Sequence, residues 1–357
     1  MINPLHLPRR LSVSFLLLGL LSCSNSTPSP APTPAPVPTP TATTFTNPLL
    51  PVGPDPWVIQ KDEFYYYMST TGGDITLRKT AKMSELGSAP SYVVWRAPAS
   101  GTNSRNVWAP ELHFFDGKWY LYYTAGPGDL GQQRSWVLEN AAADPTTGTW
   151  TDMGRIFNAA EDYWSIDMTV FEQGGNRYAL WSGFQNNFNN EQRIYICRMS
   201  NPWTLTGART ELSRPALDWE RRGDPKVNEG PEIVMHGSKT NLVYSASHCS
   251  SDDYTLGLLS CATSADPLLA ASWTKSPTPV FVRSDASRAY GPGHNGFFKS
   301  KDGTQDWIIY HANSNPGEGC GDRRNPRMQP FTWNADDTPN FGAPVSIATA
   351  LTRPSGE

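Results

Sequence analysis

The sequence predicts an all-β protein, a five-bladed β-propeller, from its composition and from one hairpin pattern that recurs five times. The chain of 357 residues contains 13 Trp, 14 Tyr and 14 Phe together with 29 Gly and 32 Pro, and charged residues make up only 17%. Aromatic residues favour strands, and Gly and Pro favour the turns between strands. The composition therefore indicates many short strands joined by turns.

The first 22 residues are expected to be a signal peptide. Arg9 and Arg10 precede an apolar run over 11–21, which is too short to span a bilayer as a helix and is typical of an export signal. The letters "LLSC" at 20–23 resemble a bacterial lipobox, which implies that Cys23 is lipidated. An ordinary secretory signal with an incidental Cys is the alternative. Either way, the protein is expected in the bacterial cell envelope or outside the cell.

Residues 23–44 are expected to form an extended tether. Pro occupies every second position from 28 to 40, so the segment cannot pack into a core and favours a polyproline conformation. If Cys23 carries a lipid, the chain touches the membrane only through this anchor. The tether would then hold the folded domain, 45–357, clear of the membrane surface.

The recurring pattern is an apolar strand, a polar turn and an aromatic strand that ends in small residues. It occurs over 55–70, 111–125, 167–183, 232–247 and 296–312. The aromatic strands can be aligned on Met68, Tyr123, Trp181, Tyr244 and Tyr310. The intervals between these five anchors are 55, 58, 63 and 66 residues, the length of a four-stranded blade with its loops. A β-sandwich would give no reason for such a period, and we expect the two chain ends to pair and close the propeller.

Ionisable residues recur where the first strand of each hairpin begins. Counting back 12 to 16 residues from the five anchors reaches Asp55, Glu111, Asp167, Glu229 and His294. The innermost strands of a propeller begin at one face, so we expect these five side chains to converge on a central pocket. Each alone could be a turn residue or part of a rim salt bridge, but the set favours a pocket.

Carboxylates that converge in an aromatic cleft are the groups that hydrolyse glycosidic bonds. One protonated carboxyl donates a proton to the leaving oxygen, and a second acts as base or nucleophile. Trp57, Trp108 and Trp164 each lie within a few residues of a ring position and are candidate sugar platforms, with core packing as the alternative for at least one. The net charge of −4 without a basic face gives no sign of a nucleic-acid partner.

Five motifs resemble glycoside hydrolase family 43 when they are taken in order over 45–357. They are "GPDPWVI", "WAPEL", "SIDMTVF", "NEGPEI" and "GPGHNGFF". The resemblance implies a five-bladed propeller that hydrolyses arabinose- or xylose-containing plant polysaccharides with inversion. It makes Asp55 the general base, Glu229 the general acid, and Asp167 the group that orients the acid and raises its pKa.

The resemblance also bears on the remaining site residues. His294 matches a histidine that in several members lies near a metal, usually calcium, and no other cofactor is expected. Arg324 or Arg327 of "RRNPRMQPFTW" would approach the site. Glu232 stands where the family commonly has His, Tyr or Ala, so it remains an alternative acid, although we expect it to point away from the scissile bond.

The substrate inferred from the resemblance is α-1,5-arabinan or its oligosaccharides, cleaved from the end by an exo-acting α-L-arabinofuranosidase. A β-xylosidase, an endo-arabinanase and a non-catalytic glycan-binding propeller are the alternatives. We expect a monomer.

If Cys23 is lipidated, four cysteines remain for disulfides: Cys197, Cys249, Cys261 and Cys320. They can pair in three ways, which the sequence does not distinguish. Four buried thiols are the alternative.

Overall fold

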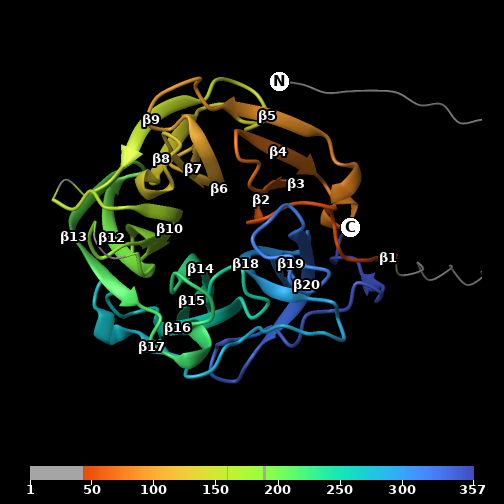
Figure 1. The fold of residues 1–357 in the computed structure, drawn as a ribbon. Coiled ribbons are helices and arrows are strands. Elements are labelled where there is room, and N and C mark those ends of the chain that lie inside the picture. Colours follow the sequence, from red (N-terminus) through yellow and green to blue (C-terminus); the bar gives the residue numbers. More distant parts are fainter. Residues whose placement is uncertain (1–42, 159, 188–189) are drawn as a thin grey trace, which may run out of the picture. The chain divides into compact units, whose positions relative to one another are not determined.

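The computed structural model describes residues 43–158, 160–187 and 190–357, which form a ring of five antiparallel sheets of four strands each (Figure 1). The predicted five-bladed β-propeller is confirmed. The signal peptide, Cys23 and all but the last two residues of the tether lie outside the described residues. Among the described residues, none of the helices is long and apolar enough to cross a membrane.

The four strands of each blade follow one another in the sequence. Blade 1 comprises β2 (Trp57–Lys61), β3 (Phe64–Met68), β4 (Asp74–Thr80) and β5 (Ser91–Arg96). Blade 2 comprises β6 (Arg105–Phe115), β7 (Lys118–Gly126), β8 (Arg134–Asn140) and β9 (Thr151–Ile156). Blade 3 comprises β10 (Ser165–Gln173), β11 (Asn176–Gly183), β12 (Arg193–Asn201) and β13 (Thr204–Ser213).

The last two blades are built in the same way. Blade 4 comprises β14 (Asn228–His236), β15 (Lys239–Ala246), β16 (Thr255–Ala262) and β17 (Thr274–Lys275). Blade 5 comprises β18 (Tyr290–Lys299), β19 (Asp306–Asn313), β20 (Asn325–Trp333) and β21 (Pro339–Asn340). Short 3-10 helices lie between the strands: η1 (Met83–Ser88), η2 (Leu130–Gln132), η3 (Asp218–Glu220) and η4 (Ala270–Ser272).

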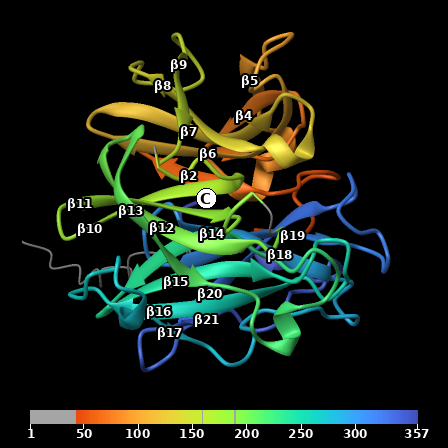
Figure 2. The same cartoon turned by 60° about the vertical axis from the view of Figure 1, so that its left-hand side comes forward.

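The first strand of every blade lies next to the axis of the ring (Figures 1 and 2). These strands are β2, β6, β10, β14 and β18, and each contacts the first strands of both neighbouring blades. All five anchor residues lie in the second strand of a blade, so the five predicted hairpins are confirmed. Asp116 and Gly117 join β6 to β7 with φ values of 52° and 79°, the left-handed backbone that a tight two-residue hairpin requires.

Strand alternation explains how each blade packs against two neighbours. In β7, Tyr120 and Tyr122 point into the apolar cluster shared with blade 3, whereas Trp119, Leu121 and Tyr123 point into the cluster shared with blade 1. Successive side chains of a strand face opposite sides of the sheet, so a strand of continuous apolar residues suits a sheet buried on both faces. The core of the ring consists of five such clusters, one between each pair of adjacent blades.

The two ends of the folded domain pair with each other, as predicted. Strand β1 (Thr44–Phe45) forms a two-stranded antiparallel sheet with β22 (Leu351–Thr352), separate from the blades. Phe45, together with Leu49 and Leu50, also fills the apolar cluster between blades 1 and 5. The ring is therefore closed by a short pairing of its ends and by burial of the segment that precedes β2.

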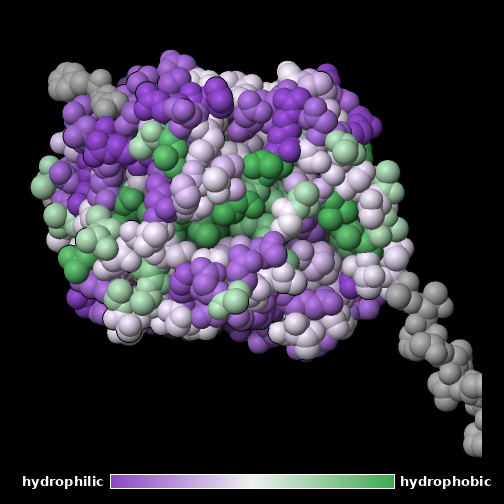
Figure 3. Space-filling model, turned by 90° about the horizontal axis from the view of Figure 1, so that it is seen from below, coloured by the Kyte–Doolittle hydropathy of each residue, from purple (hydrophilic) through white to green (hydrophobic). Residues whose placement is uncertain are grey.

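The face of the ring seen from below Figure 1 is mainly polar (Figure 3). Apolar residues gather in a hollow across its middle. The outermost strands of blades 4 and 5, β17 and β21, have only two residues each. A groove of about 520 Å³ lies beside them, lined in part by Leu258, Val280 and Pro339. It shares no residue with the pocket described below.

Candidate active site

A residue with left-handed backbone occurs near the start of the first strand in all five blades. It lies just before that strand in blade 1 and within it in blades 2 to 5. These residues are Asp55 (φ 56°), Ala109 (φ 41°), Asp167 (φ 54°), Gly230 (φ 53°) and His294 (φ 49°). In blades 2 to 5 the pairing of the first two strands shifts at this point, which is a β-bulge. A bulge turns a side chain out of its regular direction, and such strained residues concentrate at functional sites. The bulges therefore place side chains from different blades around the axis.

This comparison corrects the predicted ring at two positions. Blade 2 places Ala109 at the ring, and Glu111 lies two residues further along the strand. Blade 4 places Gly230 there, and Glu229 precedes it. Counting from the anchors was wrong for Glu111. The bulge residue Ala109 lies 14 residues before the anchor, whereas Glu111 lies only 12 before it, so the count stopped two residues short of the bulge. The sequence pattern does not reveal where a bulge adds a residue.

Seven of the ten predicted site residues line one pocket of about 460 Å³ at the axis. They are Asp55, Trp108, Asp167, Trp164, Glu229, His294 and Arg324. The three predicted catalytic carboxyls are among them and come from blades 1, 3 and 4. The volume lies within the range of small-molecule sites.

Trp57, Glu111 and Arg327 do not line the pocket, and the structure places these three predicted site residues elsewhere, with Trp57 in the core packing that was its alternative. The Trp57 indole donates to the Leu112 carbonyl at 3.0 Å and packs between blades 1 and 2. Glu111 is buried and pairs with His113 at 3.0 Å. Arg327 is fully buried. Its guanidinium donates to two backbone carbonyls, one of them that of Asn313, and to the side-chain oxygens of Asn325 and Ser314. All three have structural roles in the packing between blades or loops.

The pocket has one apolar wall and one polar wall. Trp164 stacks on Phe184 with ring centroids 4.2 Å apart, and its indole donates to the Leu130 carbonyl at 2.8 Å. Trp108 and the exposed Leu130 extend this wall. The remaining wall carries Arg324 and four further residues, which are His248, Cys249, Cys320 and Asp322. A pocket of this kind matches the apolar faces and the hydroxyl edges of a sugar.

Asp55 is held by polar and cationic partners on all sides. Its carboxylate accepts from Arg324 Nη1 at 2.8 Å and from Thr70 Oγ1 at 2.7 Å. His294 Nδ1 lies 3.4 Å away, and His311 Nδ1 accepts the Asp55 backbone N–H at 3.1 Å. Burial raises the pKa of Asp55, but Arg324, His294 and His311 outweigh it and hold that pKa well below the ordinary range. Asp55 is therefore ionised throughout the neutral range.

Glu229 has the opposite protonation behaviour. Burial raises its pKa to about 7, and the charge of Asp55 acts in the same direction. The Tyr254 hydroxyl donates to Glu229 Oε1 at 2.9 Å and, like Arg324, lowers the pKa in part. A carboxyl that holds its proton near neutral pH can act as a general acid.

Asp167 is a buried carboxyl that contacts the strand of Glu229. Its Oδ2 accepts the Gly230 backbone N–H at 3.0 Å, and its own N–H donates to Thr124 Oγ1 at 3.1 Å. Burial and then the charge of Glu229 raise the pKa of Asp167 well above its usual value. Asp167 and Glu229 thus form a coupled pair that retains a proton at neutral pH.

Glu232, the alternative acid, lies outside the pocket. It is 5% exposed and forms hydrogen bonds with Glu111 and Thr169. Burial, followed by the charge of Glu111, raises its pKa well above the usual value. A hydrogen bond between two carboxyls requires a proton on one of them, and the raised pKa of Glu232 favours a proton on that residue.

Several site residues were not predicted from the sequence. Thr70 and His311 both contact Asp55: Thr70 follows the second strand of blade 1, and His311 lies in the second strand of blade 5. Tyr254 contacts Glu229 and precedes the third strand of blade 4. Gln192 also lines the pocket. Thr70 and His311 lie at the ends of two recurring hairpins, but the hairpin pattern does not mark them as site residues. Each of these residues reaches the site through the arrangement of the blades.

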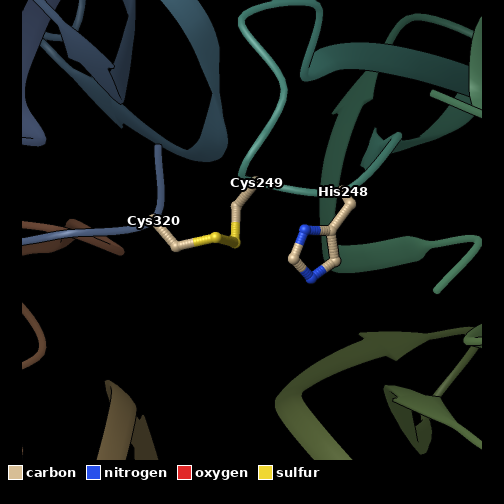
Figure 4. Close-up of side chains that lie close together, drawn as sticks. All are labelled: His248, Cys249 and Cys320. Atoms are coloured by element: carbon tan, nitrogen blue, oxygen red, sulfur yellow. A yellow bond between two sulfur atoms is a disulfide. The ribbon is translucent and has the colours of Figure 1, made fainter. Parts of the chain in front are cut away.

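Two of the four cysteines of the folded domain form a disulfide, Cys249–Cys320, and the prediction of disulfides is confirmed for this pair. Cys197 and Cys261 are buried free thiols, as the alternative had it. His248 lies beside the disulfide at the pocket (Figure 4). Within the described ranges, these three residues are the only group of three potential metal ligands, and the two sulfurs are bonded to each other.

The donors around His294 do not match a calcium site made by the protein. Calcium takes six to eight oxygen ligands. His294 instead packs against Gly230 and faces the Asp55 carboxylate, which Arg324 and Thr70 already engage. These residues therefore do not by themselves fit the calcium ion inferred beside His294, and no catalytic step is assigned to it.

Comparison with known proteins shows the family. A family described as Glycosyl hydrolases family 43 matches residues 45–339. The chain is 44% identical over 311 residues to an extracellular exo-α-(1→5)-L-arabinofuranosidase of Streptomyces avermitilis, covering 85% of this chain and 64% of the relative. An enzyme of the same description from Streptomyces chartreusis is 38% identical over 272 residues, covering 75% and 82%. The chain thus spans less than two thirds of the length of the first relative.

A solved structure gives the same result for the fold. The α-L-arabinofuranosidase of Lactobacillus brevis superimposes with a TM-score of 0.80 at 35% identity, covering 85% of this chain and 98% of that one.

Proposed function

The chain belongs to glycosyl hydrolases family 43, and on that premise we propose that it is an inverting glycosidase acting on arabinan. It releases L-arabinose from the ends of α-1,5-arabinan or arabino-oligosaccharides. The observation that carries the proposal is the opposite protonation of two carboxyls in one pocket: Arg324 and two histidines keep Asp55 ionised, and burial keeps a proton on Glu229. A base and an acid facing one pocket are what single-displacement hydrolysis requires.

In the proposed reaction, Asp55 takes a proton from a water molecule as the water oxygen attacks the anomeric carbon. Glu229 gives its proton to the glycosidic oxygen as the bond from that oxygen to the anomeric carbon breaks. Asp167 orients Glu229 through the Gly230 N–H, and the two carboxyls repel each other when both are ionised, which favours a proton on the pair. The apolar wall of Trp108 and Trp164 supports the sugar ring.

Arabinose is the proposed sugar because the relatives from Streptomyces avermitilis and Streptomyces chartreusis carry that activity in their names. The substrate test compares release from nitrophenyl α-L-arabinofuranoside, nitrophenyl β-D-xyloside and linear arabinan. We expect turnover of the arabinofuranoside and monomeric arabinose from arabinan. Faster turnover of the xyloside would indicate a β-xylosidase, oligosaccharides as first products an endo-arabinanase, and binding without turnover a glycan-binding propeller.

The stereochemistry of the product tests the role of Asp55. A base that activates water stands about 6.5–9.5 Å from the acid, and a nucleophile about 5–5.5 Å. Proton NMR recorded before mutarotation should show β-arabinose appearing first from an α-linked substrate. If α-arabinose appears first, the reaction passes through a covalent intermediate and Asp55 is the nucleophile.

We further propose that the protein is exported and anchored to a membrane through lipidated Cys23. The apolar run, the lipobox-like "LLSC" and the Pro-rich segment support this, as do the names of relatives that are extracellular. The substitution Cys23→Ser should move the protein from the membrane fraction to the soluble one and abolish incorporation of labelled fatty acid. Labelled fatty acid in the variant would contradict the anchor.

A further inference from the structure

Two irregular loops carry the residues that tune the acid and the base. The loop over 247–254 joins β15 to β16 in blade 4, and the loop over 314–324 joins β19 to β20 in blade 5. The first loop ends at Tyr254, which contacts Glu229, and the second ends at Arg324, which contacts Asp55. The Cys249–Cys320 disulfide joins these two loops.

We propose that the Cys249–Cys320 disulfide is a positioning element of the active site, which braces Tyr254 against the acid and Arg324 against the base, so that reduction lowers the rate and moves the pH range of activity. This inference rests on the roles of Asp55 and Glu229 in the proposed function.

The contacts of the second loop show how the brace reaches the base. Arg324 lies four residues after Cys320, and its backbone N–H and Nε both donate to the Gly321 carbonyl, next to the disulfide. The Arg324 carbonyl in turn accepts the Gly53 N–H at 3.0 Å, two residues before Asp55. Movement at Cys320 is therefore passed along four residues to the guanidinium that contacts Asp55.

The first loop connects the disulfide to the acid in the same manner. Tyr254 is fully buried, and its N–H donates to the Ser251 carbonyl at 3.1 Å in a tight turn after Cys249. Its ring stacks on His311, with centroids 5.7 Å apart, so it contacts residues around both carboxyls. Displacement of this turn would change the hydrogen bond from Tyr254 to Glu229.

Apart from the disulfide, the contact between the two loops is modest. The Asp252 carboxylate accepts the Gly317 N–H at 2.9 and 3.1 Å, and Gly317 is exposed. Exposed hydrogen bonds of this kind contribute little to holding a geometry. The disulfide closes a segment of 71 residues and supplies the covalent link between the two blades at the pocket.

A reductant in solution can reach this disulfide. Cys249 and Cys320 are both part-exposed and line the pocket. Dithiothreitol delivers two electrons and two protons, cleaves the S–S bond to two thiols, and is itself oxidised to its cyclic disulfide. Cys197 and Cys261 are already free thiols, so the reductant changes no other bond between described residues.

The direction of the pH change follows from the groups that face each carboxyl. Asp55 faces Arg324, His294 and His311, and Glu229 faces Tyr254, Arg324, Asp55 and the coupled Asp167. Both Arg324 and Tyr254 favour the ionised carboxylate, so loosening them raises the pKa of Asp55 and of Glu229. The acid and alkaline limbs of the pH–rate profile should therefore both move to higher pH.

The experiment measures kcat, KM and the pH–rate profile of the full chain on nitrophenyl arabinofuranoside before and after reduction with dithiothreitol. The double variant Cys249→Ser/Cys320→Ser is measured alongside. We expect kcat to fall about tenfold and both limbs to move upward by about 0.5–1 pH unit, equally in the reduced protein and in the variant. Circular dichroism at the assay temperature checks that the fold is retained.

Two controls separate this effect from other causes. Dithiothreitol should cause no further change in the double variant, and Cys261→Ser, with the disulfide intact, should keep the profile of the unaltered protein. Unmoved limbs after reduction would overturn the inference even if the melting temperature fell, because the disulfide would then act on stability alone. An oxidised protein that turns over neither arabinofuranosides nor xylosides would overturn the proposed function and this inference with it.

Discussion

The base side and the acid side of the pocket use the same functional group in opposite states. Asp55 sits in blade 1 among Arg324 and two histidines, which hold its pKa low in spite of burial. Glu229 in blade 4 is part-buried, but a neutral Tyr254 is its hydrogen-bond partner, and its pKa rises to about 7. The comparison teaches that burial raises the pKa on both sides and that direct contact with the Arg324 guanidinium decides which carboxyl is ionised.

The backbone is alike on the two sides, and this isolates the effect of the neighbours. Asp55 has a φ of 56°, and Gly230, which follows Glu229, has a φ of 53°. A left-handed residue thus lies at Asp55 and next to Glu229, although only blade 4 has a bulge at this point. The two histidines and the Arg324 guanidinium come from blade 5, through β18, β19 and the loop before β20. Blade 5 therefore supplies the electrostatic asymmetry, and it supplies no carboxyl to the ring.

Removal of the base should have the largest effect on activity. Asp55→Asn retains the shape of the side chain and abolishes proton acceptance, so kcat/KM should fall roughly 10³- to 10⁴-fold. The loss should be the same on arabinan and on nitrophenyl arabinofuranoside, because water must be activated whatever the leaving group. A loss confined to one substrate would contradict a general base at Asp55.

Removal of the acid should discriminate between the same two substrates. Glu229→Gln leaves no proton to donate, so kcat/KM on arabinan, whose leaving group departs as an alkoxide, should fall about 10²- to 10³-fold. Nitrophenolate departs unaided, so the loss on the nitrophenyl substrate should be at most about tenfold. Equal losses on both substrates would make Glu229 a structural residue and break the comparison.

Substitution of Asp167 should act mainly on the pH profile. The coupled pair of Asp167 and Glu229 loses its last proton at a raised pKa, because the first carboxylate repels the second. Asp167→Asn removes that repulsion and lowers the pKa of Glu229, so the alkaline limb should move to lower pH, with a loss in kcat of roughly tenfold. An alkaline limb and a rate that both stay unchanged would remove Asp167 from the mechanism.

The sequence predicted the blades and most of the pocket, for physical reasons that can be stated. Each blade buries both faces, so its second strand carries an aromatic run that recurs at a visible period, as at Met68 and Tyr123. The bulges leave no such mark, because one added residue does not alter the apolar pattern. This is why Glu111 was placed in the ring where Ala109 stands.

The partners of the catalytic carboxyls could not be predicted for a different reason. His311 and Tyr254 are single residues that reach the pocket only after blades 4 and 5 have packed. The pairing of Cys249 with Cys320 depends likewise on two loops that lie 71 residues apart in the sequence. Contacts of this kind have no local pattern, whereas the three carboxyls proposed to be catalytic lie near the starts of hairpins.

The smallest effect is expected for Glu232→Gln, which tests whether the acid side has one proton donor or two. Glu232 is buried beside Glu111, outside the pocket, and its raised pKa favours the protonated form. A glutamine has the shape of the protonated acid and can donate the same hydrogen bond to Glu111, so kcat/KM should change by less than about threefold on either substrate. Glu232→Ala, which leaves a buried gap, is the matched control for packing and should lower the melting temperature. A loss on arabinan as large as that of Glu229→Gln, with the nitrophenyl substrate spared, would make Glu232 the proton donor.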